Sequence, residues 1–292
     1  MRRKSTKLLL VLAVLFTAQT AHGQYYYYDN NYYDNDIIWE IGFSTGLMTG
    51  ITDIGGKKGF MPNFGSSQLN AGAYAGVMYQ NVAGVRLEAT WGKIAGADSN
   101  GAQTRRNLSF RSSIREIALI GEFHPLMLRY RDQPPQFSPY VAFGMGWFSF
   151  NPQANLNGKW IDLQPLRTEG QGFPERPGTR PYRLSQSNII GGMGVKYELS
   201  QWLSLRAEML LRLTFTDYLD DAHSTYVDPA WFDTNLPAQQ ATLAKELYDR
   251  SKDKDPAFSG PGAVRAGSGT NDHYMTFNPK FAINLGRQRT DY

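Results

Sequence analysis

Eight segments of this chain alternate between apolar and polar residues with a period of two, and this pattern restricts the fold more than any other feature. In residues 139–149, for example, Val141, Phe143 and Met145 alternate with alanine and glycine. A period of two places each set of side chains on one face of a β-strand. Each segment has about the 9–11 residues that a tilted transmembrane strand needs, and eight is an even number within the range of bacterial barrels. The segments are 37–49, 69–79, 85–93, 113–123, 139–149, 188–199, 202–215 and 274–285.

The residues on the polar faces decide between two all-β folds. A soluble sandwich or lipocalin-like barrel shows the same alternation, but its apolar side chains point inward and its charges outward. The polar faces here combine repeated glycine with six acids and five bases, and glycine is poor in strand interiors. The narrow interior of an eight-stranded barrel is filled by side chains, where balanced charges can pair. We therefore predict an all-β fold, an eight-stranded antiparallel transmembrane β-barrel with long loops and no open pore, whose lumen charge network is Glu40, Arg86, Glu88, Glu116, Glu122, Lys196, Glu198, Arg206, Glu208, Arg212 and Lys280.

The N-terminus has the three parts of a secretory signal peptide. Four basic residues at positions 2, 3, 4 and 7 precede an apolar run at 8–16, and small residues follow up to Gly23. The run of nine residues is too short for a membrane anchor, which takes roughly 17–25, so we expect cleavage of residues 1–23. Removal lowers Lys+Arg from 30 to 26, equal to the 26 Asp+Glu. A mature chain without net charge argues against nucleic-acid binding, and the absence of cysteine excludes a lipoprotein, disulfides and thiol chemistry.

The connections between the segments alternate in length. Short ones join the second segment to the third, the fourth to the fifth and the sixth to the seventh, whereas residues 50–68, 94–112, 150–187 and 216–273 form long loops. Outer-membrane barrels have short periplasmic turns and long outer loops. We therefore expect a periplasmic Tyr/Asn/Asp-rich tail at 24–36, an outer-membrane barrel at 37–286 and a C-terminal tail at 287–292. Residues 237–250 predict a short helix in the last loop.

No pattern of catalytic or metal-binding residues stands out. His124, His223 and His273 form no metal-binding motif, and we expect His124 to pack at the membrane interface beside a strand end. Asp217, Asp220 and Asp221 could bind a hard cation, but they lack the glycine and glutamate of an EF-hand loop, so a solvated or salt-bridged loop is the expected role. The sequence predicts no catalytic residues, no metal and no cofactor; a lipid-modifying enzyme would need a histidine with a serine or acid at the lipid-facing rim.

Several short motifs go beyond general barrel composition, and together they resemble the PorG family of outer-membrane barrels in the type IX secretion system. The similarity spans roughly residues 37–228, whereas 229–271 match no part of that family. The motifs are Trp39-Glu40-Ile41-Gly42, Asp53-Ile54-Gly55-Gly56, Arg106-Asn107-Leu108-Ser109-Phe110-Arg111-Ser112, Ser138-Pro139-Tyr140, Phe150-Asn151-Pro152, Trp160-Ile161-Asp162-Leu163-Gln164-Pro165-Leu166, Thr168-Glu169-Gly170-Gln171-Gly172 and Phe215-Thr216-Asp217-Tyr218-Leu219-Asp220-Asp221.

This resemblance implies a structural role rather than an enzyme. PorG-like proteins tie a periplasmic ring of PorK and PorN to the outer membrane, in a machine that exports proteins and, in some bacteria, supports gliding. The implied partners are PorK/PorN-like ring proteins and outer-membrane lipids, with no nucleic acid and no small-molecule substrate. Most of the motifs lie in loops that the topology places outside the cell, where a periplasmic ring cannot reach, and the resemblance leaves this difficulty open.

The predicted topology offers three surfaces to a periplasmic partner: residues 25–36, 126–137 and 287–292. The middle one is stiff and basic, so its candidate contact residues are Arg129, Arg131, Pro134 and Pro135; a plain solvated turn is the alternative. The other function that the sequence leaves open is a free-standing small barrel that acts as a receptor, an adhesin or a membrane-stabilising protein.

Overall fold

The computed structural model describes residues 32–55, 64–100, 103–129, 135–200, 202–255, 258–267 and 269–289. The expected signal peptide at 1–23 and most of the expected tail at 24–36 lie outside these residues.

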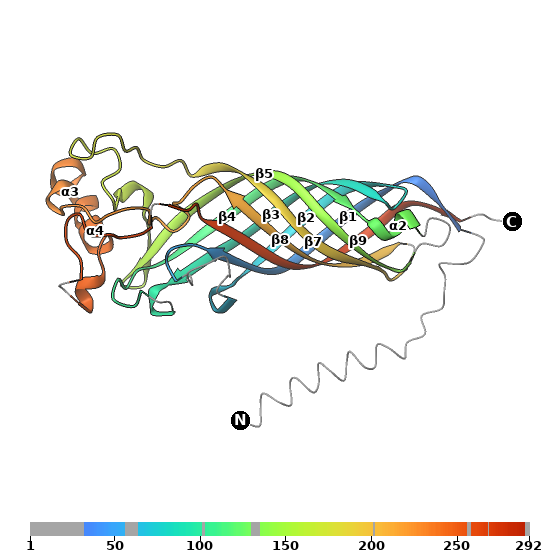
Figure 1. Cartoon of the computed structure of the whole chain (residues 1–292), viewed down its shortest axis with the longest axis horizontal. Coiled ribbons are helices and arrows are strands. Elements are labelled where there is room, and N and C mark those ends of the chain that lie inside the picture. Colours follow the sequence, from blue (N-terminus) through green and yellow to red (C-terminus); the bar gives the residue numbers. More distant parts are fainter. Residues whose placement is uncertain are drawn as a thin grey trace, which may run out of the picture.

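Eight antiparallel strands form a closed ring, which confirms the predicted eight-stranded barrel (Figure 1). Each strand pairs with its neighbour along the chain, and the first and last strands pair to close the ring. A ninth, short strand extends the sheet from β5 without joining the ring. The ring strands are β1 (Tyr32–Ile51), β2 (Gln68–Tyr79), β3 (Ala83–Ala97), β4 (Ser109–Phe123), β5 (Phe137–Leu156), β7 (Ser185–Glu198), β8 (Leu203–Thr214) and β9 (His273–Arg289).

The outer face of the ring carries mostly large apolar side chains, whereas all eleven charged residues predicted for the lumen are buried inside it. On β5, Phe143 and Met145 are 66% and 69% exposed, whereas Glu88 on β3 and Arg212 on β8 are buried. This is the reverse of a soluble barrel, where water contacts the polar face, and it is what a wall in contact with lipid requires. In the described parts of the chain, no helix is long and apolar enough to cross a membrane.

The strands extend beyond the alternating segments at both ends of the chain. β1 begins at Tyr32 and β9 ends at Arg289, and their outer parts pair with each other, with Tyr32 opposite Arg289. Residues 32–36 and 287–289 are therefore strand, although the sequence placed them in tails. The side-chain pattern could not show this, because ladder hydrogen bonds use the backbone and need no apolar side chain.

β5 also continues past its predicted end and turns back into β6 (Lys159–Asp162). The turn uses Asn157 and Gly158, both with positive φ, which is the backbone conformation of a two-residue hairpin. Part of the connection expected to be a long loop is thus a β-hairpin. The Asn-Gly pair between β5 and β6 is the local sequence signal of this hairpin.

Short helices mark the two ends of the barrel (Figure 1). α2 (Pro125–Arg129) lies between β4 and β5, at the end where β9 finishes. At the opposite end lie α3 (Ala230–Asn235) and α4 (Ala238–Leu247), and α4 confirms the helix expected within 237–250. Single 3₁₀ turns, η2 (Phe64–Ser66), η3 (Asp98–Asn100), η4 (Gln164–Leu166) and η5 (Ser251–Asp253), occur in the long loops.

Candidate functional site

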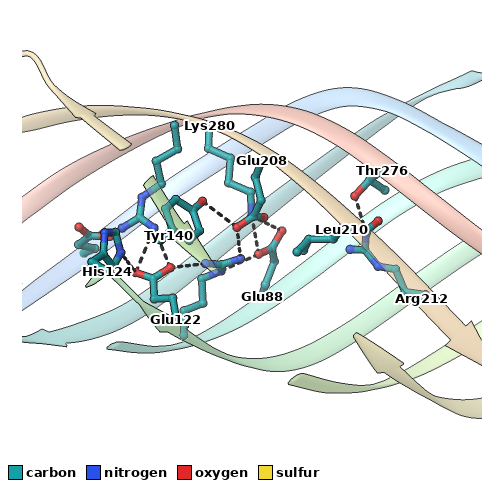
Figure 2. Close-up of polar contacts among 12 residues, drawn as sticks. Glu88, Glu122, His124, Tyr140, Glu208, Leu210, Arg212, Thr276 and Lys280 are labelled. Carbon is teal, nitrogen blue, oxygen red and sulfur yellow. Dashed lines mark hydrogen bonds and ion pairs between the residues drawn. The ribbon is translucent and has the colours of Figure 1, made fainter. Parts of the chain in front are cut away.

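The larger of two groups of ion pairs in the lumen is centred on Arg86 of β3. Figure 2 shows its carboxylates Glu88, Glu122 and Glu208 beside Lys280. The guanidinium of Arg86 donates to Glu88 at 3.0 Å, to Glu208 at 2.5 Å and to Glu122. Lys280 of β9 lies 2.6 Å from both Glu88 and Glu208. A single arginine therefore joins carboxylates from three strands, so these strands are held together across the lumen as well as along their edges.

Arg206 extends this group toward the end of the barrel that carries α2. It donates to Glu122 at 2.8 and 3.0 Å and also to Glu40. Lys196 donates to Glu40 at 2.5 Å and lies 3.4 Å from Glu198. Nine of the eleven predicted lumen residues thus belong to one chain of contacts, with every charge adjacent to an opposite one.

The other two predicted lumen residues, Glu116 and Arg212, form a second group nearer the long loops. Their nearest nitrogen and oxygen are 3.2 Å apart. Asn188 donates to Glu116 at 2.8 Å, and the Tyr274 hydroxyl donates to the same carboxylate. The structure therefore buries all eleven residues and gives each an ion pair.

Aromatic rings that were not among the predicted lumen residues lie between these charges. Tyr140 donates to Glu208 at 2.8 Å, and the ring of Tyr74 lies near three cations, with Lys280 Nζ 5.2 Å from its centroid. A Cβ at Gly194 would lie 2.5 Å from the Tyr140 ring. The inward glycines therefore make room for tyrosine. Because Tyr74 and Tyr140 share the inward side of their strands with such glycines, the alternation could have placed them there.

His124 was expected to pack at the membrane interface, but the structure buries it at the end of the lumen. Its Nδ1 lies 2.9 Å from the Ser138 hydroxyl, its Nε2 lies 3.6 Å from Glu122, and its ring stacks on Tyr140. The strand register turns this side chain inward, because Glu122 and His124 are two residues apart and share a face.

The long loops fold into a compact body over one end of the barrel, which we call the cap and define as the described residues of 52–55, 98–108, 157–184 and 215–272. Two apolar clusters hold it together. The first joins loop residues such as Leu219 to ring residues such as Phe148, and the second joins α3 and α4 to the β5–β7 connection through Phe173 and Phe232. The sequence predicted these segments as loops and did not predict that they share a core.

Buried ion pairs also stabilise the cap. Arg265 lies 2.9 Å from Glu169 and 3.7 Å from Asp221, and it donates to the Tyr248 carbonyl at 3.0 Å. Burial alone would raise the pKa of Glu169, but Arg265 and hydrogen bonds from the amides of His223 and Ser224 hold this pKa below its usual value. Glu169 is therefore a charged, fully engaged group rather than a free acid.

Carboxylates tie separate loops of the cap together through backbone amides. Asp220 accepts from the amides of Ile54 at 2.8 Å and Ala222 at 2.9 Å, and Asp272 accepts from Leu219 at 2.9 Å. Burial raises the pKa of Asp220 to about 7. The pKa of Asp272 is also raised well above its usual range, mainly by burial and in addition by the negative charge of the nearby Asp220.

The hydrogen bonds of Asp217, Asp220 and Asp221 engage oxygens that a bound cation would need. Asp221 accepts from the Thr168 and Tyr182 hydroxyls at 2.5 and 2.6 Å, and Asp217 lies 2.6 Å from His223. Within the described ranges, no group of three or more His, Asp or Glu side chains could hold a metal ion. The acidic run is buried, and both carboxylate oxygens of Asp220 and Asp221, together with Oδ2 of Asp217, bond to the protein itself.

The structure describes two of the four candidate partner contacts. Arg129 ends α2, and Pro135 lies just before β5. Arg131 and Pro134 lie outside the described residues. The segment predicted as a turn contains the short helix α2, which buries Met127 and exposes Leu128.

The fold and its filled lumen define an eight-stranded transmembrane β-barrel with a folded cap. No protein-family model and no curated protein matches the chain. Among solved structures, it resembles a major outer membrane protein from Thermus thermophilus, with 12% identity, a TM-score of 0.39 and coverage of 86% of this chain and 100% of that one. It also resembles Ail, the attachment invasion locus protein of Yersinia pestis, with 8% identity, a TM-score of 0.38 and coverage of 87% and 100%. The third structure is the Escherichia coli outer membrane protein W, with 13% identity, a TM-score of 0.35 and coverage of 86% of this chain and 98% of that one.

Proposed function

We propose that this protein is a non-enzymatic outer-membrane anchor, a closed barrel that holds other proteins at the membrane. The observation that carries this proposal is the filled lumen, in which eleven buried charges pair with one another. The interior of an eight-stranded barrel is just wide enough for side chains to fill, so a lumen occupied by these paired charges leaves no continuous water-filled path. The barrel therefore acts through its two ends rather than through its interior.

The resemblance to the PorG family suggests the particular assembly, a type IX secretion system in which the barrel carries a periplasmic PorK/PorN-like ring. The cap offers an answer to the difficulty that most of the family-like motifs lie far from the periplasm. Arg106 pairs with Asp98, Glu169 with Arg265, and Asp221 bonds to Thr168. These motif residues point into the cap, so their role on this proposal is to build it. Contact with the ring is left to the opposite end, where α2 and the ends of β1 and β9 lie.

Site-specific cross-linking in native cells tests this assignment. A photo-cross-linking amino acid at Leu128, which is 62% exposed on α2, should capture a periplasmic ring protein, identified by mass spectrometry of the purified adduct. The matched position is Val264, which is 70% exposed on the cap and should capture no ring protein. Absence of ring proteins from the Leu128 adducts, together with their absence from barrels purified out of native membranes, would reject the anchor function.

One observation favours a second function, that of a free-standing receptor or adhesin. The cap has its own apolar core of α3, α4 and the β5–β7 connection, and a rigid outer body can present a binding surface better than flexible loops can. On this alternative, the Val264 position captures an external protein and the Leu128 position captures none.

A further inference from the structure

One patch on the outside of the barrel carries positive charge at the edge of the apolar wall. On the half of the ring strands nearest the cap, the charged side chains at outward positions that the structure describes are Lys93, Arg111 and Arg115. All three lie on the neighbouring strands β3 and β4. We call these three residues the basic patch.

The strand register places this patch where the apolar wall ends. Arg115 pairs with Trp91 on one side and with Ser149 on the other. The next outward-facing pair on these strands, farther from the cap, is apolar and consists of Ile117 opposite Trp147. Tryptophans mark the level at which hydrocarbon gives way to lipid headgroups, so the basic patch lies at headgroup depth.

The three cations are close to one another. Lys93 pairs with Ser113, so Arg111 and Arg115 are its two diagonal neighbours on β4, about 7–8 Å away in Cα separation. Three like charges at this spacing repel one another unless an anion lies among them.

No carboxylate of the described chain supplies that anion. Lys93 and Arg115 are exposed and form no ion pair among the described residues. Arg111 donates to the Gln153 amide oxygen at 3.0 Å, and its guanidinium lies 3.8 Å from the ring centroid of Trp160. The neighbouring acid, Asp162, instead accepts from the side-chain amides of Asn151 at 2.9 Å and Gln153 at 2.6 Å.

We propose that Lys93, Arg111 and Arg115 bind the phosphate groups of a lipid headgroup in the leaflet that faces the cap. Arginine presents a planar fork that matches phosphate oxygens, and lysine adds a compact point charge. The stack on Trp160 and the bond to Gln153 hold Arg111 in place, so less side-chain freedom is lost when the phosphate binds. A phosphorylated glycolipid such as lipid A has this chemistry. The inference is independent of the proposed ring contact, which lies at the other end of the barrel.

Lipid retention by the purified full-length protein tests the proposal. The barrel is placed in zwitterionic nanodiscs that contain lipid A, and native mass spectrometry counts the lipid A molecules that remain bound. Neutralising the patch in a K93Q/R111Q/R115Q variant should lower retention about tenfold to 100-fold, because each cation near a membrane surface contributes to anionic lipid binding. Retention by the native chain should also fall as salt rises.

The matched control, R105Q/R180Q/K254Q, removes the same net charge from exposed positions of the cap and should retain lipid A as the native chain does. A K93Q/R115Q variant keeps the Arg111–Trp160 stack and should lose most of the retention as well. Equal retention by the native chain and both patch variants would overturn the proposal. Equal loss in the control, or binding of a soluble sulfated polysaccharide at the patch without any of lipid A, would also overturn it. The shift of folded barrels on unheated gels verifies that each variant is folded.

Discussion

Replacing Arg206 by methionine should destabilise the barrel by about 3–5 kcal/mol, the cost of removing one partner from a buried ion pair. Arg206 is buried in the lumen, and its guanidinium contacts both Glu40 and Glu122. Methionine would fill much of the volume of the arginine side chain, but it would leave the buried negative charges of Glu40 and Glu122 without one of their positive partners. The loss would be measured as the change in free energy of unfolding, from urea titrations of the barrel in lipid vesicles.

Two further variants make this result specific. Arg115→Met removes an exposed arginine from the outside of the same barrel and should change the free energy of unfolding by no more than about 1 kcal/mol. Arg206→Lys keeps the charge but loses the fork that reaches both carboxylates, so its destabilisation should lie between the other two. If Arg206→Met costs as little as Arg115→Met, the lumen ion pairs do not stabilise the fold.

The second large effect is a loss of cap stability as pH rises. The carboxyl of Asp220 has an ordinary pKa of 3.8 in the unfolded chain, and burial in the folded cap raises this pKa to about 7. A raised acid pKa means that the folded state binds the proton more tightly, so this contribution is complete below pH about 4 and is lost as pH rises through about 7. A difference of about three pH units, at about 1.4 kcal/mol each, amounts to roughly 4 kcal/mol. The negative charge that forms on Asp220 as pH rises is repelled by three carboxylates, Asp53, Asp217 and Asp272, and is attracted by Arg106. His223 also contacts one of these carboxylates, Asp217.

Amide hydrogen exchange measures this effect directly. Protection of the Ile54, Leu219 and Ala222 amides, which bond to Asp220 or Asp272, should fall at least about tenfold between pH 6 and pH 9 after correction for base catalysis. Strand amides should keep their protection. Asp220→Asn should weaken the pH dependence at the Ile54 and Ala222 amides, which bond to Asp220, whereas Asp233→Asn, at an exposed position on α3, should not. Protection that rises with pH would show that the sign of the linkage is wrong.

The alternating pattern predicted the wall of the barrel because it is a local property of each strand. Inward and outward faces follow from a period of two, and this placed Glu40, Arg86 and Lys280 on the lumen side. The pattern could not show which charges pair, because the partners lie across the barrel. Arg206 and Glu40, for example, are 166 residues apart, and their contact depends on how the strands are staggered.

The packing of the long loops into the cap could not be predicted from the sequence for a similar reason. Its residues follow no single period, and its contacts join distant loops, as in the hydrogen bond between Ile54 and Asp220. The acidic run after β8 predicted a solvated or salt-bridged loop, with a cation site as the alternative, since nothing local indicates that Asp220 would bond to backbone amides of other segments. The hairpin at Asn157 and Gly158 is the exception, because its turn residues carry a local signal.

The central claim, a closed barrel, is tested most directly by conductance across a planar lipid bilayer. The refolded full-length protein is inserted at single-molecule density, and insertion is verified by protease digestion of the cap from one side. The filled lumen predicts that verified insertions leave the current at the level of the bare membrane over a wide range of voltage. A steady conductance that scales with the number of inserted barrels would contradict the account, because it requires a water-filled path through the ion pairs of Arg86 and Arg206.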